Sequence, residues 1–206
     1  MVKVIAVDLQ YDFTRPEGKH FKSSRTCLET IKLNVIPILL HAEVDIGEII
    51  SDYRQPRPGD LDDSCNPGTW GYTSEIPDVL VGSRWVKCMN SPFFTRDNIG
   101  VADKPPGLPR AFPELFYDWL ASFVKPDDTV VLFGLTLDCC VLCTAQAIRF
   151  KGYDVRILLD ATDTYDGGEE SRRQTMDLVV SNWAKPMTID EFRLANFGNT
   201  NVQQHQ

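Results

Sequence analysis

Six short apolar runs constrain the fold of this chain most strongly, because segments with helical spacing separate most of them. The runs span residues 2–7, 44–50, 84–88, 129–133, 153–159 and 186–189, and the helical segments span residues 27–42, 116–123, 141–151 and 169–183. Strands that alternate with helices are joined by right-handed crossovers, which give a parallel sheet covered by helices on both faces. The sequence therefore predicts an α/β protein with three layers, α/β/α, around a mainly parallel six-stranded sheet.

The chain length favours one domain rather than two. A chain of 206 residues is large enough to bury a substantial core as a single unit. No internal repeat or low-complexity linker marks a boundary, so we expect one domain over residues 1–206, with a flexible tail after about residue 195. Residues 53–83 and 100–113 are rich in proline and glycine and are predicted to form loops.

Composition excludes several classes of partner. The net charge of −8, with no cluster of Lys and Arg, argues against nucleic-acid binding. No apolar stretch approaches the roughly 20 residues that span a bilayer, and the first residues lack the pattern of a secretory signal. Six cysteines without regular spacing indicate reduced thiols, and no second C-x-x-C or histidine pair completes a zinc framework. We therefore expect a cytoplasmic protein that acts on a small molecule.

Polar residues that could take part in catalysis or ligand binding follow the predicted strands. Asp8, Asp52, Lys87 or Cys88, Cys140 and Asp160 all lie at or near the carboxyl ends of strands, which is where open α/β sheets bind ligands. For Asp52 and Asp160, a helix cap or a solvated loop charge is at least as good an interpretation. Asp8 follows an apolar run directly and must be paired if it is buried.

Cys140 follows the strand predicted at residues 129–133 and a short turn, at the start of the helix predicted at residues 141–151. The unpaired N–H groups and the dipole of a helix start favour the thiolate, which is the nucleophilic form. A buried structural thiol is the alternative, and it is the interpretation that we favour for Cys139 and Cys143. Cys140 and Cys143 also form a C-x-x-C pair, which leaves a redox role open.

Three motifs occur in a fixed order along the chain. They read VIAVDLQ at residues 4–10, VKCMNSPF at residues 86–93 and GLTLDCCV at residues 134–141. Together they resemble the isochorismatase-like cysteine hydrolase family, and the resemblance extends over about residues 2–190. It implies a sheet with Rossmann-type strand order. Any one motif alone is a weak signal, whereas the ordered set is specific.

The resemblance also implies a reaction centre. Asp8, Lys87 and Cys140 match the catalytic triad of the family, in which the lysine and the helix start lower the thiol pKa and the aspartate accepts the thiol proton. The oxyanion is expected to bind the backbone N–H groups of Thr136 and Cys140, with a cis peptide bond between Leu135 and Thr136. The thiolate would form a thioester, which water activated by Asp8 would hydrolyse.

One departure from the family concerns metal binding. Nicotinamidase-like members hold a metal through an aspartate and histidines in the loop after the second strand. In this chain Arg54 and Ser64 stand where those histidines are expected. We therefore expect no metal and no other cofactor, and we interpret Arg54 as a cation that binds an anionic or carbonyl-rich substrate.

Three aromatic residues are candidates for the wall of a substrate pocket. They are Phe13, Trp70 and Phe93, which lie in or near the motifs and the loop between them. Packing in the ordinary core explains each of them equally well.

The function predicted from these residues is hydrolysis of a C–N bond in a small amide, carbamoyl or ureido compound, through a thioester on Cys140. Vinyl-ether hydrolysis of an isochorismate-like diacid is the alternative within the fold. A thiol redox protein that uses Cys140 and Cys143 is the alternative from another class, and a non-enzymatic binder is a fourth. A homo-oligomer, dimer or tetramer, is expected, because the helix at residues 169–183 carries more apolar residues than one sheet face needs.

Overall fold

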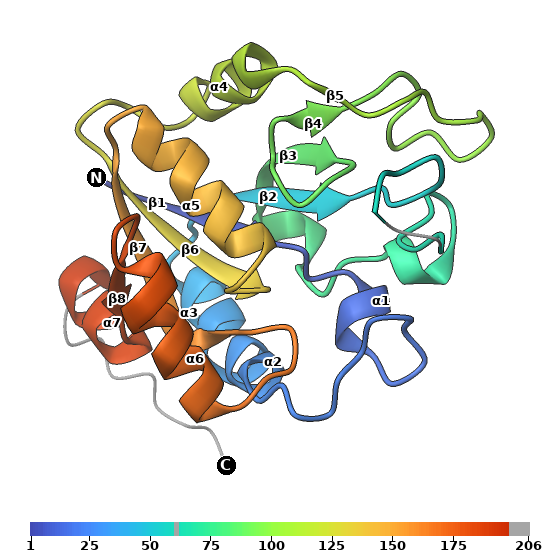
Figure 1. The fold of residues 1–206 in the computed structure, drawn as a ribbon. Helices are drawn as coiled ribbons and strands as arrows, with labels where there is room; N and C mark the ends of the chain where they lie inside the picture. The colour runs from blue at the N-terminus through green and yellow to red at the C-terminus, as the bar shows by residue number, and fades with distance from the viewer. Residues whose placement is uncertain (60–61, 198–206) are drawn as a thin grey trace.

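A parallel sheet of six strands runs through the centre of the molecule (Figure 1). The structure is a computed structural model that describes residues 1–59 and 62–197. The sheet has the order β3-β2-β1-β6-β7-β8, with β1 Val2–Val7, β2 Ile46–Ser51, β3 Val81–Lys87, β6 Thr129–Leu135, β7 Asp154–Asp163 and β8 Lys185–Met187. Every pair of neighbouring strands is parallel. Both the parallel sheet and its Rossmann-type order are confirmed.

Helices connect these strands. They are α1 Tyr11–Thr14, α2 Cys27–Thr30, α3 Ile36–His41, α4 Pro113–Ala121, α5 Cys140–Phe150, α6 Glu169–Thr175 and α7 Ile189–Phe197. A π-helical turn, Ile31–Val35, joins α2 to α3, and a second one, Met176–Val180, extends α6. Single 3-10 turns lie at Trp70–Tyr72 and Asp78–Leu80, and a small hairpin pairs β4 Phe94–Thr95 with β5 Arg110–Ala111.

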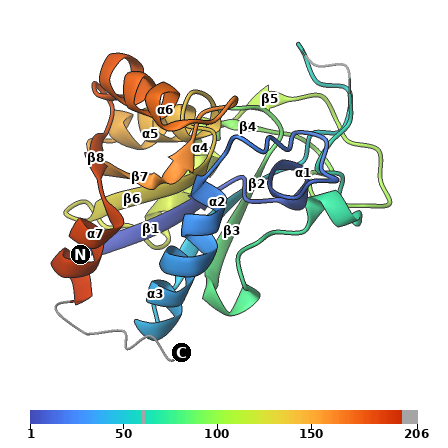
Figure 2. The ribbon, with the colours of Figure 1, turned by 90° about the horizontal axis from the view of Figure 1, so that it is seen from below.

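Alternating residues of β1 build two separate cores, one on each face of the sheet. Val4 and Ala6 pack with apolar residues of α2, α3 and α7. Ile5 and Val7 point to the opposite face and pack with residues of α4, α5 and the extension of α6. Because side chains alternate along a strand, one buried apolar run fills both interiors. Figure 2 shows the resulting layers, with α5 and α6 on one side of the strands and α2 and α3 on the other.

The predicted elements differ from the observed ones at several ends. β7 continues to Asp163, beyond the predicted end at residue 159, past an irregularity in its pairing with β6. The β4–β5 hairpin was not predicted, because strands of two residues carry no periodic pattern. Helix α7 was also missed, and it extends to Phe197. From residue 198, the tail predicted after about residue 195 lies outside the described residues.

Within residues 1–59 and 62–197, no helix combines the length and the apolar character that crossing a membrane requires. The turn after α6 exposes apolar surface, since Leu178 is 79% exposed and Val179 is 46% exposed. Trp183 packs edge-on against Phe150 beside it, with ring centroids 5.4 Å apart. A single chain does not test the predicted homo-oligomer, which stays a prediction.

The strand order reverses direction at one place in the sheet, between β1 and β6. From β1 it builds outward through β2 and β3, and it then returns to the other side of β1 to form β6, β7 and β8. The carboxyl ends of β1 and β6 therefore diverge into loops on opposite sides, which opens a crevice at this point of the sheet. Asp8 and Cys140 follow these two strands.

Candidate active site

Lys87, at the carboxyl end of β3, is the centre of a buried polar cluster. Its side chain is 0% exposed. The ammonium Nζ donates three hydrogen bonds of 2.8 Å each, to Asp8 Oδ2, Ser51 Oγ and Tyr53 OH. A buried ammonium is costly unless an opposite charge and hydrogen-bond acceptors surround it. The cluster provides both, because it draws on residues that follow or end β1 and β2.

Asp8 uses both of its carboxylate oxygens in this cluster. Oδ2 faces Lys87, and Oδ1 accepts a 2.8 Å hydrogen bond from Ser51 Oγ. The backbone of Asp8 has a φ of 50°, in the left-handed region that aspartate tolerates better than most residues. Its backbone N–H still donates to Ile49 O at 2.9 Å. The turn after β1 is thereby held against β2, with the carboxylate directed at Lys87.

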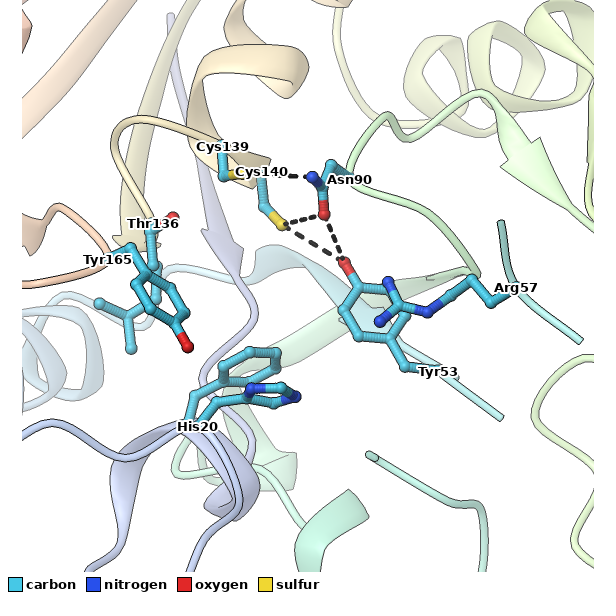
Figure 3. A pocket seen from close by; sticks show the side chains of 10 residues that line it. His20, Tyr53, Arg57, Asn90, Thr136, Cys139, Cys140 and Tyr165 are labelled. Atoms are coloured by element: carbon cyan, nitrogen blue, oxygen red, sulfur yellow. Dashed lines mark hydrogen bonds between the residues drawn. The ribbon is translucent and has the colours of Figure 1, made fainter. Parts of the chain in front are cut away.

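Cys140 is the first residue of α5, and its sulfur reaches the same cluster. Sγ lies 3.4 Å from Lys87 Nζ, 3.4 Å from Tyr53 OH and 3.7 Å from Asn90 Oδ1. Figure 3 shows the sulfur pointing towards the hydroxyl of Tyr53 and the amide of Asn90. The structure therefore brings together the three residues that the sequence predicts as a triad, with Lys87 in contact with both of the others.

The charges of this cluster correct one expectation. Burial raises the pKa of the Cys140 thiol well above its ordinary value; the Lys87 ammonium opposes this effect and the Asp8 carboxylate adds to it. For Lys87, burial acts to lower the pKa, but the Asp8 carboxylate together with Cys140 and Tyr53 outweighs it and the pKa is raised. The thiol pKa is therefore not lowered, because burial outweighs the charge of Lys87. The cluster therefore places the Lys87–Asp8 ion pair beside the Cys140 sulfur.

The sulfur of Cys140 lies in the wall of a pocket of about 250 Å³. The pocket is mixed in character, with aromatic rings, two residues that can carry positive charge, and polar groups near the thiol (Figure 3). Its lining residues are Phe13, His20, Tyr53, Arg57, Asn90, Leu135, Thr136, Cys139, Cys140 and Tyr165. A volume of this size suits a small molecule rather than a polymer.

The two backbone N–H groups predicted for an oxyanion belong to pocket residues. Thr136 and Cys140 both line the pocket, and the peptide bond between Leu135 and Thr136 is cis. As the first residue of α5, Cys140 has an N–H with no carbonyl partner inside the helix. The carbonyl of Thr136 accepts hydrogen bonds from the N–H groups of Cys139 and Val141, each 3.0 Å long, which fixes the turn before the helix.

Of the three aromatic residues predicted to form the wall, Phe13 alone lines the pocket. Its ring stacks on His20, with centroids 5.2 Å apart. Trp70 lies outside the pocket, is 48% exposed and packs on Tyr11. Phe93 packs against the aromatic rings of α4 in the core on one face of the sheet. The pocket prediction is therefore corrected for Trp70 and Phe93.

Arg54 also lies outside the pocket, which corrects its predicted contact with substrate. Its Nε and Nη2 donate to the two carboxylate oxygens of Asp52, at 2.9 and 2.7 Å. The remaining donors bind backbone carbonyls of a distant loop, those of Asn98, Val101 and Lys104. Arg54 therefore ties the proline-rich excursion to the end of β2.

The surroundings of Asp52 do not fit a metal ion. Its carboxylate also accepts hydrogen bonds from Arg96 Nη2, at 3.1 Å, and from the N–H of Gly100, at 2.9 Å. Two guanidinium groups thus occupy the space around the oxygens that a cation would need. Ser64, at the other expected ligand position, is hydrogen-bonded to His20 Nε2 at 2.9 Å. Among the described residues, no group of three or more His, Cys, Asp or Glu could hold a metal ion.

Comparison with solved structures identifies the fold. An isochorismatase-like hydrolase from Alkaliphilus metalliredigens superimposes with a TM-score of 0.64 and 20% identity, over 94% of this chain and 98% of that one. The chain has the isochorismatase-like fold. An N-carbamoylsarcosine amidase from Thermoplasma acidophilum (TM-score 0.59, 19% identity, 92% and 97% of the chains) has this fold too. So does a pyrazinamidase from Pyrococcus horikoshii in complex with zinc (TM-score 0.61, 19% identity, 91% and 98%).

No protein-family model matches the sequence, and no curated protein matches it either. At identities of 15 to 20% the structural likeness establishes the isochorismatase-like fold alone.

The guanidinium groups around Asp52 predict that activity does not depend on a divalent metal. Arg54 and Arg96 already neutralise the carboxylate, so chelation has no ion to remove from it. We expect elemental analysis of the purified protein to find no stoichiometric zinc, iron or manganese, and dialysis against EDTA to leave the turnover rate unchanged. About one metal ion per chain, lost together with activity, would contradict this prediction.

Sequence reasoning missed five residues of the pocket: Tyr53, Asn90, Arg57, His20 and Tyr165. Arg57 lies over the ring of Tyr53, with its guanidinium carbon 3.9 Å from the centroid. Asn90 Nδ2 donates to Cys139 Sγ at 3.2 Å. One sequence signal could have identified Tyr53: it is a polar aromatic residue just past the end of a buried strand, where a buried hydroxyl needs hydrogen-bond partners. The other four come from loops whose paths the sequence pattern does not predict.

Proposed function

We propose that this protein is a cysteine hydrolase that cleaves the C–N bond of a small amide, carbamoyl or ureido compound. One observation carries the proposal: Lys87 Nζ contacts both Asp8 Oδ2, at 2.8 Å, and Cys140 Sγ, at 3.4 Å, beside a pocket of about 250 Å³. The proposal is also supported by proteins of the same fold that are named nicotinamidase, pyrazinamidase and N-carbamoylsarcosine amidase.

The first step forms a thioester. As Cys140 Sγ bonds to the substrate carbonyl carbon, the thiol proton passes to the Asp8 carboxylate, so no free thiolate has to accumulate before the substrate binds. The carbonyl oxygen becomes an oxyanion, which the backbone N–H groups of Thr136 and Cys140 bind. The C–N bond then breaks, Asp8 returns its proton to the nitrogen, and ammonia or an amine leaves.

The second step hydrolyses the thioester. Asp8 takes a proton from water as the water oxygen bonds to the carbonyl carbon, and the C–S bond then breaks. The proton passes to the sulfur, which restores the neutral Cys140 thiol, and the acid product leaves. Lys87 stays protonated throughout. Its role is to hold the carboxylate of Asp8 in place and to balance its charge.

The contacts of Cys140 favour this reaction over the two alternatives. A vinyl-ether hydrolase can work with the aspartate alone, and it has no need for a thiol in contact with the lysine. A redox role needs Cys140 to face Cys143, whereas its sulfur faces Lys87, Tyr53 and Asn90. All six cysteines lie within the described residues and are free thiols.

A screen of small carbonyl–nitrogen compounds tests the proposal. Primary amides, N-carbamoyl compounds and ureido acids are incubated with the protein, and release of ammonia is measured. We expect one of these classes to be hydrolysed, and intact-protein mass spectrometry of a slow substrate to show an acyl adduct on Cys140. Turnover that persists unchanged in Cys140→Ala, or the absence of hydrolysis across all three classes, would contradict the proposal.

A further inference from the structure

Lys87 uses all three N–H bonds of its ammonium on partners other than the sulfur of Cys140. An ammonium has three N–H bonds, and Lys87 directs them to Asp8, Ser51 and Tyr53 at 2.8 Å each. The contact from Nζ to Cys140 Sγ, at 3.4 Å, is a fourth one. Lys87 therefore acts on the sulfur through its charge, and it can donate a hydrogen bond there only by giving up a shorter one.

Tyr53 has the donor that Lys87 lacks. Its oxygen accepts from Lys87 Nζ, so its own O–H remains to be donated. Two acceptors lie within reach of that proton, Cys140 Sγ and Asn90 Oδ1, both 3.4 Å from the hydroxyl oxygen. Asn90 Oδ1 is in turn 3.7 Å from Cys140 Sγ and can accept the thiol proton. The three groups form a triangle of hydrogen-bonding partners, which Figure 3 shows.

We propose that Tyr53 is a catalytic residue whose hydroxyl donates a hydrogen bond to Cys140 Sγ when the thiol loses its proton, and to Asn90 Oδ1 when the proton is on the sulfur. The inference rests on the proposed role of Cys140 as nucleophile. No covalent bond changes at Tyr53, because only the direction of its O–H differs between the two states. Burial, together with the nearby sulfur, raises the pKa of Tyr53 well above its ordinary value, so the phenol stays a donor.

Other charged or titratable groups also act on the sulfur, so a test variant must leave these residues in place. Those that face Tyr53 and Cys140 are Asp8 after β1, Arg57 and Cys65 after β2, Lys87 at the end of β3, Cys139 before α5, and His20 and Tyr165 across the pocket. Tyr53→Phe keeps each of these residues, but it removes the acceptor of one Lys87 N–H, which is then free to turn towards Cys140 Sγ. It removes one oxygen and keeps the ring against which the guanidinium of Arg57 lies.

The test measures the rate at which iodoacetamide alkylates Cys140 as a function of pH, with peptide mapping to assign the label. For Tyr53→Phe we expect the profile to move to higher pH by about one to two units, because the thiolate, a charged acceptor, loses the hydrogen bond that Tyr53 donates to it. For Asn90→Leu we expect a shift in the opposite direction, since that variant removes the competing acceptor. Tyr117→Phe is the matched control, because its hydroxyl donates to Ala147 O, away from the pocket.

Opposite shifts in the two variants support the assignment, and a Tyr53→Phe profile that coincides with wild type overturns it. If Tyr53→Phe fails to fold, the direction of the shift in Asn90→Leu decides, and no shift or an upward shift there overturns the proposal. Alkylation needs no substrate, so the result is independent of the proposed reaction. A protein that hydrolyses no amide but shows the opposite shifts would refute the function and leave the role of Tyr53 standing.

Discussion

Cys140→Ser is expected to lower the turnover number for amide hydrolysis by at least about 10⁴-fold, since removal of a nucleophile in a cooperating set costs this much or more. The serine hydroxyl is nearly the same size as the thiol and meets the same partners, Lys87, Tyr53 and Asn90. A buried alcohol is far harder to deprotonate than a thiol, so the variant should fold normally and fail at the chemical step. Steady-state kinetics and a thermal melt together measure both parts.

Cys143→Ala is the matched control for this prediction. Cys143 is half-buried on the same helix, but it is not part of the pocket wall. The variant keeps the whole triad and removes the second thiol of the C-x-x-C pair, so we expect it to retain most of the activity. A loss in Cys143→Ala that equals the loss in Cys140→Ser would instead support thiol redox chemistry.

Lys87→Met is expected to lower the free energy of unfolding by about 3–5 kcal/mol, as is typical when one partner of a buried ion pair is removed. The substitution keeps most of the side-chain volume and leaves the carboxylate of Asp8 without its counter-ion, at 1% exposure. Urea denaturation of the variant and the wild type at neutral pH gives the difference. Activity should be lost as well, because nothing then balances the charge of Asp8 beside the thiol.

The double variant Asp8→Asn/Lys87→Met separates charge from packing. Asparagine tolerates the positive φ of this position, so the second change removes the unpaired charge without straining the backbone. We expect the double variant to recover much of the lost stability and none of the activity. Equal stability of the single and double variants would show that the loss came from packing.

The contribution of Lys87 to stability should also have a defined pH range. Its pKa in the folded protein is raised above the ordinary value of 10.5, so the folded state holds this proton more tightly than the unfolded chain does. The contribution is therefore fully present below pH 10.5, and it is lost only as the pH rises from there through the raised value. The stability difference between wild type and Lys87→Met should be constant around neutral pH and should narrow under strongly alkaline conditions.

The sequence by itself determined the sheet and the positions of the three residues that we propose to react. Short apolar runs with helical segments between them allow few arrangements other than a covered parallel sheet. Asp8, Lys87 and Cys140 lie where three of those strands end, and the carboxyl ends of parallel strands share one edge of the sheet. The family resemblance singled these three out among the polar residues at that edge, and the shared edge then explains their approach without knowledge of the loops.

Only the tertiary structure decided which polar side chains face the pocket. Arg54 turns away because Asp52 and the carbonyls of a loop more than 40 residues distant satisfy its guanidinium. Arg57 lines the pocket in its place, and the hydroxyl of Tyr53 meets Lys87 and Cys140. When a long polar side chain is buried, it takes the orientation in which its hydrogen bonds are satisfied. The partners that satisfy Arg54 and Tyr53 lie mostly far from them in the sequence. No periodic pattern records such pairings, so they appear only once the chain has folded.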